Sequence, residues 1–374
     1  MRILVSGAGI AGPVLAYWLD RYGFRPTVVE RMGLLGLVRA RSTGTERMTL
    51  LRDGARPVHI EVDRVLGVAA DRQVEILRDE LSEICHDAAR DRVEYLFGDS
   101  IASVDDRGPE LAVTFERGAP RAFDLVIGAD GLHSRVRRLV FGDERRFAHY
   151  IGGYTSVLTV PGGLAVPGRM TTVAAPGRIA AVYRPRHLDE ARAVLMFRSP
   201  RRLDYHRRDT GRQKELLREH FAGIGAGVPR LLAELDRTPA FYFDEITQLR
   251  MDGWSRGRVS LVGDAGYCPG PAVGASTSMA VVGAYVLAGE LAAAGGDHTA
   301  AFGAYERAMA DYVRRGRAFA VRMVEQVIPG SPARVWAGAQ AMRLLGLLPA
   351  ARALTRRGNG MDVHDDVAVP SYPG

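Results

Sequence analysis

The feature that most constrains the fold is the stretch from Arg2 to Glu30, which places a glycine turn between two predicted strands. Residues 3–5 are apolar, as in a buried parallel strand, and the helical pattern after the turn gives way to a second short strand at 27–29. Glu30 stands at the end of that strand. The order of strand, glycine turn, helix, strand and acid is typical of a βαβ unit that binds a dinucleotide.

The turn itself has the spacing Gly-x-Gly-x-x-Gly, and each glycine has its own role. Gly7 permits the tight turn, Gly9 lets the backbone approach a pyrophosphate, and Gly12 lets the helix pack closely on the strand. Ile10 and Ala11 open the helix, whose free N–H groups and positive dipole would face the phosphates. A tight turn in some other α/β fold remains the alternative interpretation of this motif alone.

Composition indicates a soluble globular protein. The chain has 374 residues, 47% of them apolar and 25% charged, which is enough for one large or two ordinary domains. Cys85 and Cys268 form no C-x-x-C motif, so a reducing cytoplasm is the simpler expectation. The chain enters a core strand at once, which predicts no signal peptide. The longest apolar run, 279–294, contains Glu290 and is too short to predict a membrane span.

The net charge of +7 comes almost entirely from arginine, since Lys214 is the only lysine. A coding bias is one explanation, and attraction of anionic cofactors is another. A nucleic-acid-binding protein is disfavoured because the basic residues are scattered in short pairs such as Arg137 and Arg138, with no basic module interleaved with aromatic residues.

The rest of the chain divides into two patterns. Up to about residue 142 helical and strand patterns mix, and beyond it Gly and Pro turns separate a run of antiparallel strands, which would suit a substrate-covering layer. The spacing of apolar residues predicts helices at 31–40, 73–90, 212–220, 228–235, 277–294, 299–325 and 333–348. It predicts strands at 42–51, 58–62, 93–97, 101–104, 111–115, 121–128, 152–160, 171–175, 179–184, 193–197, 241–250 and 258–263.

Two further strand ends carry glycine motifs: Gly128-Ala-Asp130-Gly131, and Gly263-Asp264 before a long helix. With all three motifs in order, the chain resembles the single-component FAD-dependent aromatic hydroxylases of the para-hydroxybenzoate hydroxylase fold. Within them it is most similar to the tetracycline-inactivating and polyketide-tailoring branch. The resemblance covers about residues 1–350, and the two later motifs are more specific than the first.

The resemblance implies an α/β architecture with a three-layer, Rossmann-like FAD-binding domain, an inserted and mostly antiparallel β substrate domain, and C-terminal helices. The FAD-binding domain would comprise residues 1–145 and 251–325. The substrate domain would comprise 146–250, with a few strands near 42–62 belonging to the same layer. Residues 326–374 would form a C-terminal helix and tail.

The resemblance also assigns cofactor-binding residues around the third motif. The Asp264 carboxylate would hold a ribityl hydroxyl of FAD, and Pro271 would lie close to the flavin ring. Gly274, Ala275 and Ser276 open the next helix, so their N–H groups would face the pyrimidine edge and stabilise negative charge on reduced flavin.

Elsewhere, Asp130 and Gly131 match family residues that serve both FAD and NAD(P)H. Arg78 matches an arginine that contacts FAD, although a surface ion pair would explain an arginine there equally well. Glu30, as acceptor for the adenosine ribose diol, and Arg31 complete the expected cofactor-binding residues.

Three departures from the family pattern qualify this assignment. Tyr267 stands where the family usually has His, and Ser276 replaces a glycine. More important, Glu30 runs directly into Arg31 where family members carry a longer segment beside the flavin. Either the segment is deleted, which would open one wall of the flavin site, or it is absent from this chain. A deletion leaves open a degenerate flavoprotein or ligand-binding relative with weakened FAD binding.

The expected activity is that of an FAD-dependent monooxygenase. NADPH or NADH would reduce the flavin, and a C4a-hydroperoxyflavin would transfer one oxygen atom of O₂ to an aromatic or polyketide-like small molecule, by hydroxylation or Baeyer–Villiger oxidation. No protein acid, base or metal is assigned, because the histidines lack ligand spacing and each is expected to be satisfied within the fold. Tyr183, Tyr205 and Tyr242 are possible pocket residues, with core packing favoured for each.

A flavin-dependent halogenase is the rival enzyme class. It is disfavoured because Trp18, Trp254 and Trp336 are isolated and Lys214 lies in a polar helix. No nucleic-acid or membrane partner is expected, and the protein would be a monomer or weak homodimer.

Overall fold

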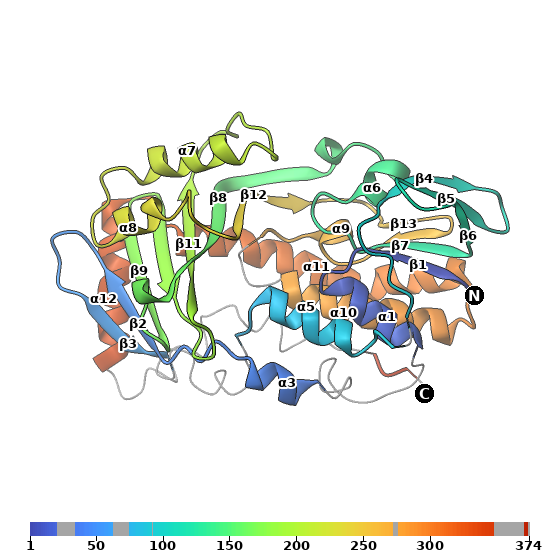
Figure 1. Ribbon diagram of the computed structural model, residues 1–374, viewed down its shortest axis with the longest axis horizontal. Coiled ribbons are helices and arrows are strands. Elements are labelled where there is room, and N and C mark those ends of the chain that lie inside the picture. The colour runs from blue at the N-terminus through green and yellow to red at the C-terminus, as the bar shows by residue number, and fades with distance from the viewer. Residues whose placement is uncertain (21–33, 63–74, 92, 272–275, 348–369, 373–374) are drawn as a thin grey trace.

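The computed structural model describes the chain except for residues 21–33, 63–74, 92, 272–275, 348–369 and 373–374 (Figure 1). Several expectations therefore lie outside the described residues, namely the strand at 27–29, the junction of Glu30 with Arg31, and the helix-opening residues Gly274 and Ala275.

A four-stranded sheet carries the three glycine motifs. Its order is β1-β7-β14-β13, with β1, β7 and β14 parallel and β13 antiparallel to β14. The parallel strands are apolar, and every residue of β7 is buried, as expected in a sheet covered on both faces. The strands are β1 (Ile3–Ser6), β7 (Leu125–Gly128), β13 (Ser255–Arg256) and β14 (Val259–Leu261).

Long helices cover this sheet, and α10 lies at the centre of their packing. It packs against α1 and α11, and α1 in turn packs against α5. Among the described residues α10 is the one helix long and apolar enough to cross a membrane, but 67% of it is buried inside the fold, as in a core helix. The helices are α1 (Ala11–Asp20), α5 (Arg78–Asp87), α10 (Ser276–Ala293) and α11 (His298–Val327).

A seven-stranded sheet forms the other half of the molecule, in the order β12-β8-β11-β10-β9-β2-β3. All its pairings are antiparallel except that of β2 with β9. Figure 1 shows that two of its strands, β8 and β12, extend toward the four-stranded sheet. The strands are β2 (Arg47–Leu51), β3 (Val58–Glu61), β8 (Ala148–Pro161), β9 (Arg169–Ala175), β10 (Arg178–Tyr183), β11 (Glu190–Arg198) and β12 (Phe241–Leu249).

The two faces of the seven-stranded sheet pack differently. One face forms an apolar core with α7 (Thr210–Phe221), which lies above the sheet in Figure 1, and with α8 (Val228–Ala233). On the opposite face α12 (Pro332–Leu347) packs against β3 and β9. Because side chains alternate between the faces of a strand, each strand supplies both surfaces.

The smaller elements connect these layers. A three-stranded sheet in the order β4-β5-β6 lies beside the four-stranded sheet. The elements are β4 (Ile101–Asp106), β5 (Leu111–Phe115), β6 (Arg121–Phe123), α3 (Leu35–Ala40), α6 (Arg135–Val140), α9 (Asp264–Tyr267), η2 (Glu144–Arg146) and η3 (Gly162–Leu164).

Most predicted elements are present, with three corrections. Residues 93–97 form no strand, because Tyr95 and Phe97 stack on each other at 5.6 Å and pack on His86 instead of joining a ladder. The single strand expected at 121–128 is two strands, β6 and β7, in different sheets. The helix expected from residue 73 begins at Arg78, so this arginine is its first residue and not one turn inside it.

Candidate cofactor and substrate site

The glycine turn after β1 packs against the second motif. Gly7 has a φ of 115°, and a Cβ there would lie 2.4 Å from the Ala129 oxygen. A Cβ on Gly12 would lie 1.9 Å from the Gly7 oxygen, so the helix approaches the turn as closely as predicted. Gly9 differs from both, because no atom of the described structure lies within 4 Å of the place its Cβ would occupy. Gly9 therefore faces open space that a ligand could fill.

The carboxylate of Asp130 is engaged within the second motif. It accepts the hydroxyl of Ser134 at 2.5 Å and the backbone N–H groups of Arg135 at 2.7 Å and Val136 at 3.1 Å. These bonds satisfy the free N–H groups at the start of α6. Gly131 follows with a φ of 78° and, like Gly9, faces open space. The motif is thus held rigidly beside the first turn.

The third motif brings Asp264 and Ser276 together. Asp264 is the first residue of α9, and Ser276, the first residue of α10, donates its hydroxyl to the Asp264 carboxylate. Pro271 is buried in the turn between the two helices. Because β1, β7 and β14 are parallel, their carboxyl ends and the three motifs lie at the same edge of the sheet, where open α/β sheets bind ligands.

Arg78 begins α5 and is exposed. Among the described residues its side chain has no ion pair, which argues against the surface-salt-bridge interpretation. Its charge acts on Tyr242 of β12: burial and Asp244 raise the pKa of this tyrosine, whereas Arg78 opposes that rise. Asp264 and Cys268 also act on Tyr242, so these residues surround one region.

Tyr267, which replaces the usual family histidine, belongs to the core. It is fully buried, its hydroxyl lies 3.0 Å from that of Tyr305, and burial raises its pKa to about 12. It therefore supports α9 and α10 from behind the site.

A buried charge network connects the motifs to β12. Arg137 is fully buried and donates to the Ala265 carbonyl at 2.8 Å and to the Glu144 carboxylate at 2.6 Å. His133 bridges Glu144 and Asp244, with 2.9 Å from Nδ1 to the first and 2.9 Å from Nε2 to the second. Hydrogen bonds to Asp244 and then Glu144 raise the pKa of His133 to about 9, so it is a cation at neutral pH.

An apolar cavity of about 440 Å³ lies between the seven-stranded sheet and α12. β2, β9, β10 and β11 line it with Leu50, Thr172, Ala181 and Val194, among others, and Ala339 closes it from α12. Tyr183, for which core packing was favoured over a place in a pocket, is also part of its wall. The size and apolar lining suit a small aromatic molecule.

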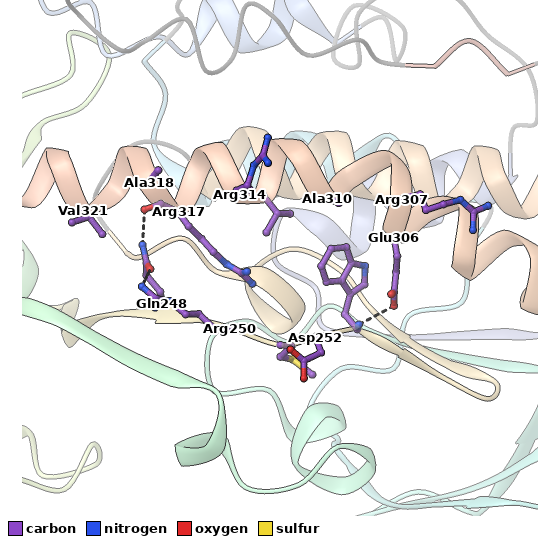
Figure 2. A pocket seen from close by; sticks show the side chains of 13 residues that line it. Gln248, Arg250, Asp252, Glu306, Arg307, Ala310, Arg314, Arg317, Ala318 and Val321 are labelled. Carbon is purple, nitrogen blue, oxygen red and sulfur yellow. Dashed lines mark hydrogen bonds between the residues drawn. The ribbon is translucent and has the colours of Figure 1, made fainter.

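A second cleft, of about 620 Å³, runs between the end of β12 and α11 (Figure 2). Four arginines line this arginine cleft: Arg250, Arg307, Arg314 and Arg317. Figure 2 shows the Arg317 side chain extending from α11 toward the strand that carries Arg250 and Gln248. The Nε and Nη2 atoms of Arg317 are buried without a hydrogen-bond partner among the described residues. Buried cationic donors left unpaired in this way favour an anionic ligand.

Metal binding has no support in the described part of the chain, where no group of three or more His, Cys, Asp or Glu side chains could hold an ion. The predicted residues that the structure gathers are Gly7, Gly9, Gly12, Asp130, Gly131, Asp264, Pro271 and Ser276, with Arg78 nearby.

This combination of fold and site defines a class. A parallel sheet with three motifs at one edge, joined to a largely antiparallel sheet over an apolar cavity, is the para-hydroxybenzoate hydroxylase type of architecture. The chain belongs to the flavin-dependent monooxygenases, since a flavin-dependent monooxygenase of Legionella longbeachae is 34% identical over 351 residues, covering 88% of this chain and 90% of that protein. It is therefore an enzyme that uses FAD.

Other relatives support this family. An uncharacterized protein of Mycobacterium tuberculosis strain H37Rv is 42% identical over 354 residues, covering 88% of this chain and 94% of the relative. The crystal structure of the tetracycline destructase Tet(55) matches with a TM-score of 0.83 and 32% identity, over 99% of this chain and 98% of the other. The Klebsiella pneumoniae HpxO structure with FAD and uric acid, at 23% identity and a TM-score of 0.72, shares the fold. No protein-family model matches the chain.

Proposed function

We propose that the protein is an NAD(P)H-consuming monooxygenase that inserts one oxygen atom of O₂ into a polycyclic aromatic or polyketide-like molecule. The observation that carries the substrate class is the apolar cavity between the sheet and α12, whose lining offers few groups to a charged ligand. The names of the relatives point the same way, since Tet(55) is a tetracycline destructase.

The residues at the sheet edge fit FAD. Open space at Gly9 leaves room for a pyrophosphate, and the start of α1 would direct N–H groups at it. Asp264, with Ser276 bound to it, would hold a ribityl hydroxyl, and Arg78 would contact the cofactor from α5. When bound, FAD supplies both the hydride acceptor and the oxygen-transferring group. The protein would orient the substrate and exclude water.

The arginine cleft would receive the phosphate groups of the electron donor. Arg317 has unpaired buried donors, and Gln248 fixes its backbone carbonyl with a bond of 2.7 Å from Nε2. Arg250 donates to the same glutamine at 3.1 Å, so the two cations are held near each other. An anion bound between these two guanidinium groups would offset the electrostatic repulsion between them.

The activity is tested by NADPH oxidation with purified protein and added FAD. We expect phenols, anthraquinones or tetracyclines to stimulate oxidation, with a product heavier by one oxygen atom in mass spectrometry. Absence of stimulation across all three classes would refute the proposed function.

The docking of the electron donor is tested separately with Arg317→Gln. The lost charge-assisted bonds should raise KM for NADPH by about 10- to 100-fold while kcat changes little. Arg322→Gln, on the same helix but outside the cleft, is the matched control and should leave KM unchanged. An unchanged KM in Arg317→Gln would place the donor elsewhere.

A further inference from the structure

Tyr242 lies on the face of the seven-stranded sheet that contains the apolar cavity. Its neighbours Phe241 and Phe243 pack in the core under α7, so Tyr242 and Asp244 point to the opposite face. The strand pairings extend this placement across the sheet, because residues in register share a face. The row that starts at Tyr242 continues through Val157, Val194, Ala181, Thr172 and Leu50.

The last four residues of this row line the cavity, whereas its first residue lies next to the cofactor-binding motifs. Strand β12 packs against α9, whose first residue is Asp264, and the charges of Asp264 and Arg78 act on the Tyr242 hydroxyl. The side chain is 43% exposed, although it stands on a well-paired strand. Tyr242 is therefore placed at the border between the cofactor site and the cavity.

The single proton of the Tyr242 hydroxyl already takes part in a hydrogen bond within the protein. The hydroxyl donates to Oδ2 of Asp244 at 3.3 Å, and a carboxylate can only accept. Asp244 is itself held in place, since its Oδ2 accepts from His133 Nε2 at 2.9 Å and its Oδ1 accepts from the Glu245 N–H at 2.9 Å. Its side chain is only 9% exposed.

Two carboxylates beside His133 hold its ring in this hydrogen-bonded position. Asp244 comes from β12 and Glu144 from η2, and each accepts one ring N–H of the cation. Arg137 on α6 donates to the Glu144 carboxylate at 2.6 Å, and the charge of Arg207 also acts on Glu144. With both its N–H groups donating, His133 cannot supply an acceptor to Asp244, and the direction of every bond in the chain is fixed.

We propose that Tyr242 is a substrate-specificity residue that accepts a hydrogen bond from a phenolic or enolic hydroxyl of the substrate, and that Asp244 and His133 are positioning residues that act through it. This inference rests on the proposed function, because it takes the apolar cavity as the substrate site. It adds to the largely apolar cavity one polar contact, at the cofactor end, that favours a hydroxyl donor over its methyl ether.

Equilibrium binding to the FAD-loaded full chain tests this, with 2,6-dihydroxynaphthalene and 2,6-dimethoxynaphthalene as probes at pH 7 and without NADPH. We expect the wild type to bind the diol about tenfold more tightly than the ether, the size of one hydrogen bond. Tyr242→Phe should weaken diol binding about tenfold and leave the ether unchanged. Tyr150→Phe, which removes a hydroxyl bonded to the Ser199 carbonyl, is the matched control and should keep the preference.

The positioning role predicts a selective effect of His133→Gln. This variant should reduce the diol preference several-fold without weakening the ether, and adding it to Tyr242→Phe should cause no further loss. A merely structural role would weaken both probes alike. The proposal is overturned if the wild type has no diol preference, if the preference survives in Tyr242→Phe, or if His133→Gln affects both probes equally. Since no turnover is measured, this outcome is independent of the activity test.

Discussion

At the scale of single residues, the three glycines of the first turn have different surroundings although they belong to one motif. A side chain on Gly12 would meet the backbone of the turn, whereas a side chain on Gly9 would meet no described atom. One position is therefore needed for the protein's own packing, and the other leaves space that the protein does not use. Substitution can separate the two roles.

Gly9→Ala should fold normally and lose FAD affinity by at least about tenfold, because the added methyl group occupies space needed by the pyrophosphate. Gly12→Ala should instead destabilise the protein by about 1–3 kcal/mol through overpacking. The ratio of flavin to protein in the visible spectrum and the thermal unfolding of the apoprotein measure the two effects. Wild-type FAD affinity in Gly9→Ala would contradict this division.

His133 makes stability depend on pH. Its pKa rises from 6.5 in the unfolded chain to about 9 in the fold, so its stabilising effect is complete below about pH 6.5 and is lost as pH rises through 9. Because the side chain is one-third exposed, we expect a loss of about 2 kcal/mol over this range. Urea unfolding from pH 6.5 to 9.5 measures it, and His133→Gln should flatten the curve. An equally steep curve in the variant would assign the effect to another group.

The glycine motifs and Asp264 could be predicted from the sequence because the residues of each motif lie close together in the chain. It assigned His133 and Tyr242 to ordinary packing, and their partners explain why. His133 bonds to Asp244, which is distant in sequence and reached only through β12. The alternation Phe241, Tyr242, Phe243, Asp244 was the available signal, since it places two polar groups on the face opposite two buried rings.

At the scale of elements, α10 and α11 show that a glycine in a helix can either permit packing or merely weaken the helix. A Cβ on Gly283 of α10 would lie 1.9 Å from the Tyr267 hydroxyl, which is fixed beside Tyr305. A Cβ on Gly303 of α11 would meet only the flexible end of Arg307, at 3.3 Å. Neither Gly303 nor Gly316 interrupts α11, which is continuous from His298 to Val327.

Gly283→Ala should therefore destabilise the protein by about 1–3 kcal/mol and reduce FAD retention, because Tyr267 and the α9 turn must move. Gly303→Ala should be neutral or more stable by up to about 1 kcal/mol, since alanine favours the helix. Denaturant midpoints for the two variants give the comparison, and similar midpoints would show that Tyr267 adapts freely.

Helices and strands were predicted correctly where apolar residues followed a single periodicity along the whole segment. It was wrong at 93–97, where alternating aromatic residues pack on His86 and form no ladder. It also merged β6 with β7, because the chain passes between two sheets without a glycine or proline to mark the change.

At the scale of the whole molecule, the apolar cavity exists only because distant parts of the chain meet. The sheet supplies most of its wall and α12 closes it. No local pattern predicted this cavity, although each strand that lines it was predicted. The convergence of the three glycine motifs at one edge was easier to predict, because each motif follows a strand of the same parallel sheet.

Gly338→Phe tests the cavity as the substrate site. Gly338 lines the cavity, and no described atom lies within 4 Å of the place its Cβ would occupy, so a phenyl group fits there and should narrow the cavity. We expect KM for a polycyclic substrate to rise at least about tenfold with FAD content unchanged. Ala337→Phe, on the exposed side of α12, is the matched control. Unchanged KM in Gly338→Phe would move the substrate elsewhere.

The parallel pairing of β2 with β9 has a consequence for how the protein is made. β2 and β3 leave the ribosome early, but their partner β9 follows only after the second motif and β8 have been synthesised, and α12 comes near the end. The hairpin of β2 and β3 therefore has an unpaired edge at β2 while much of the chain is still being translated. A fragment containing only β8 to β12 would therefore lack β2 and β3, two strands of its own sheet.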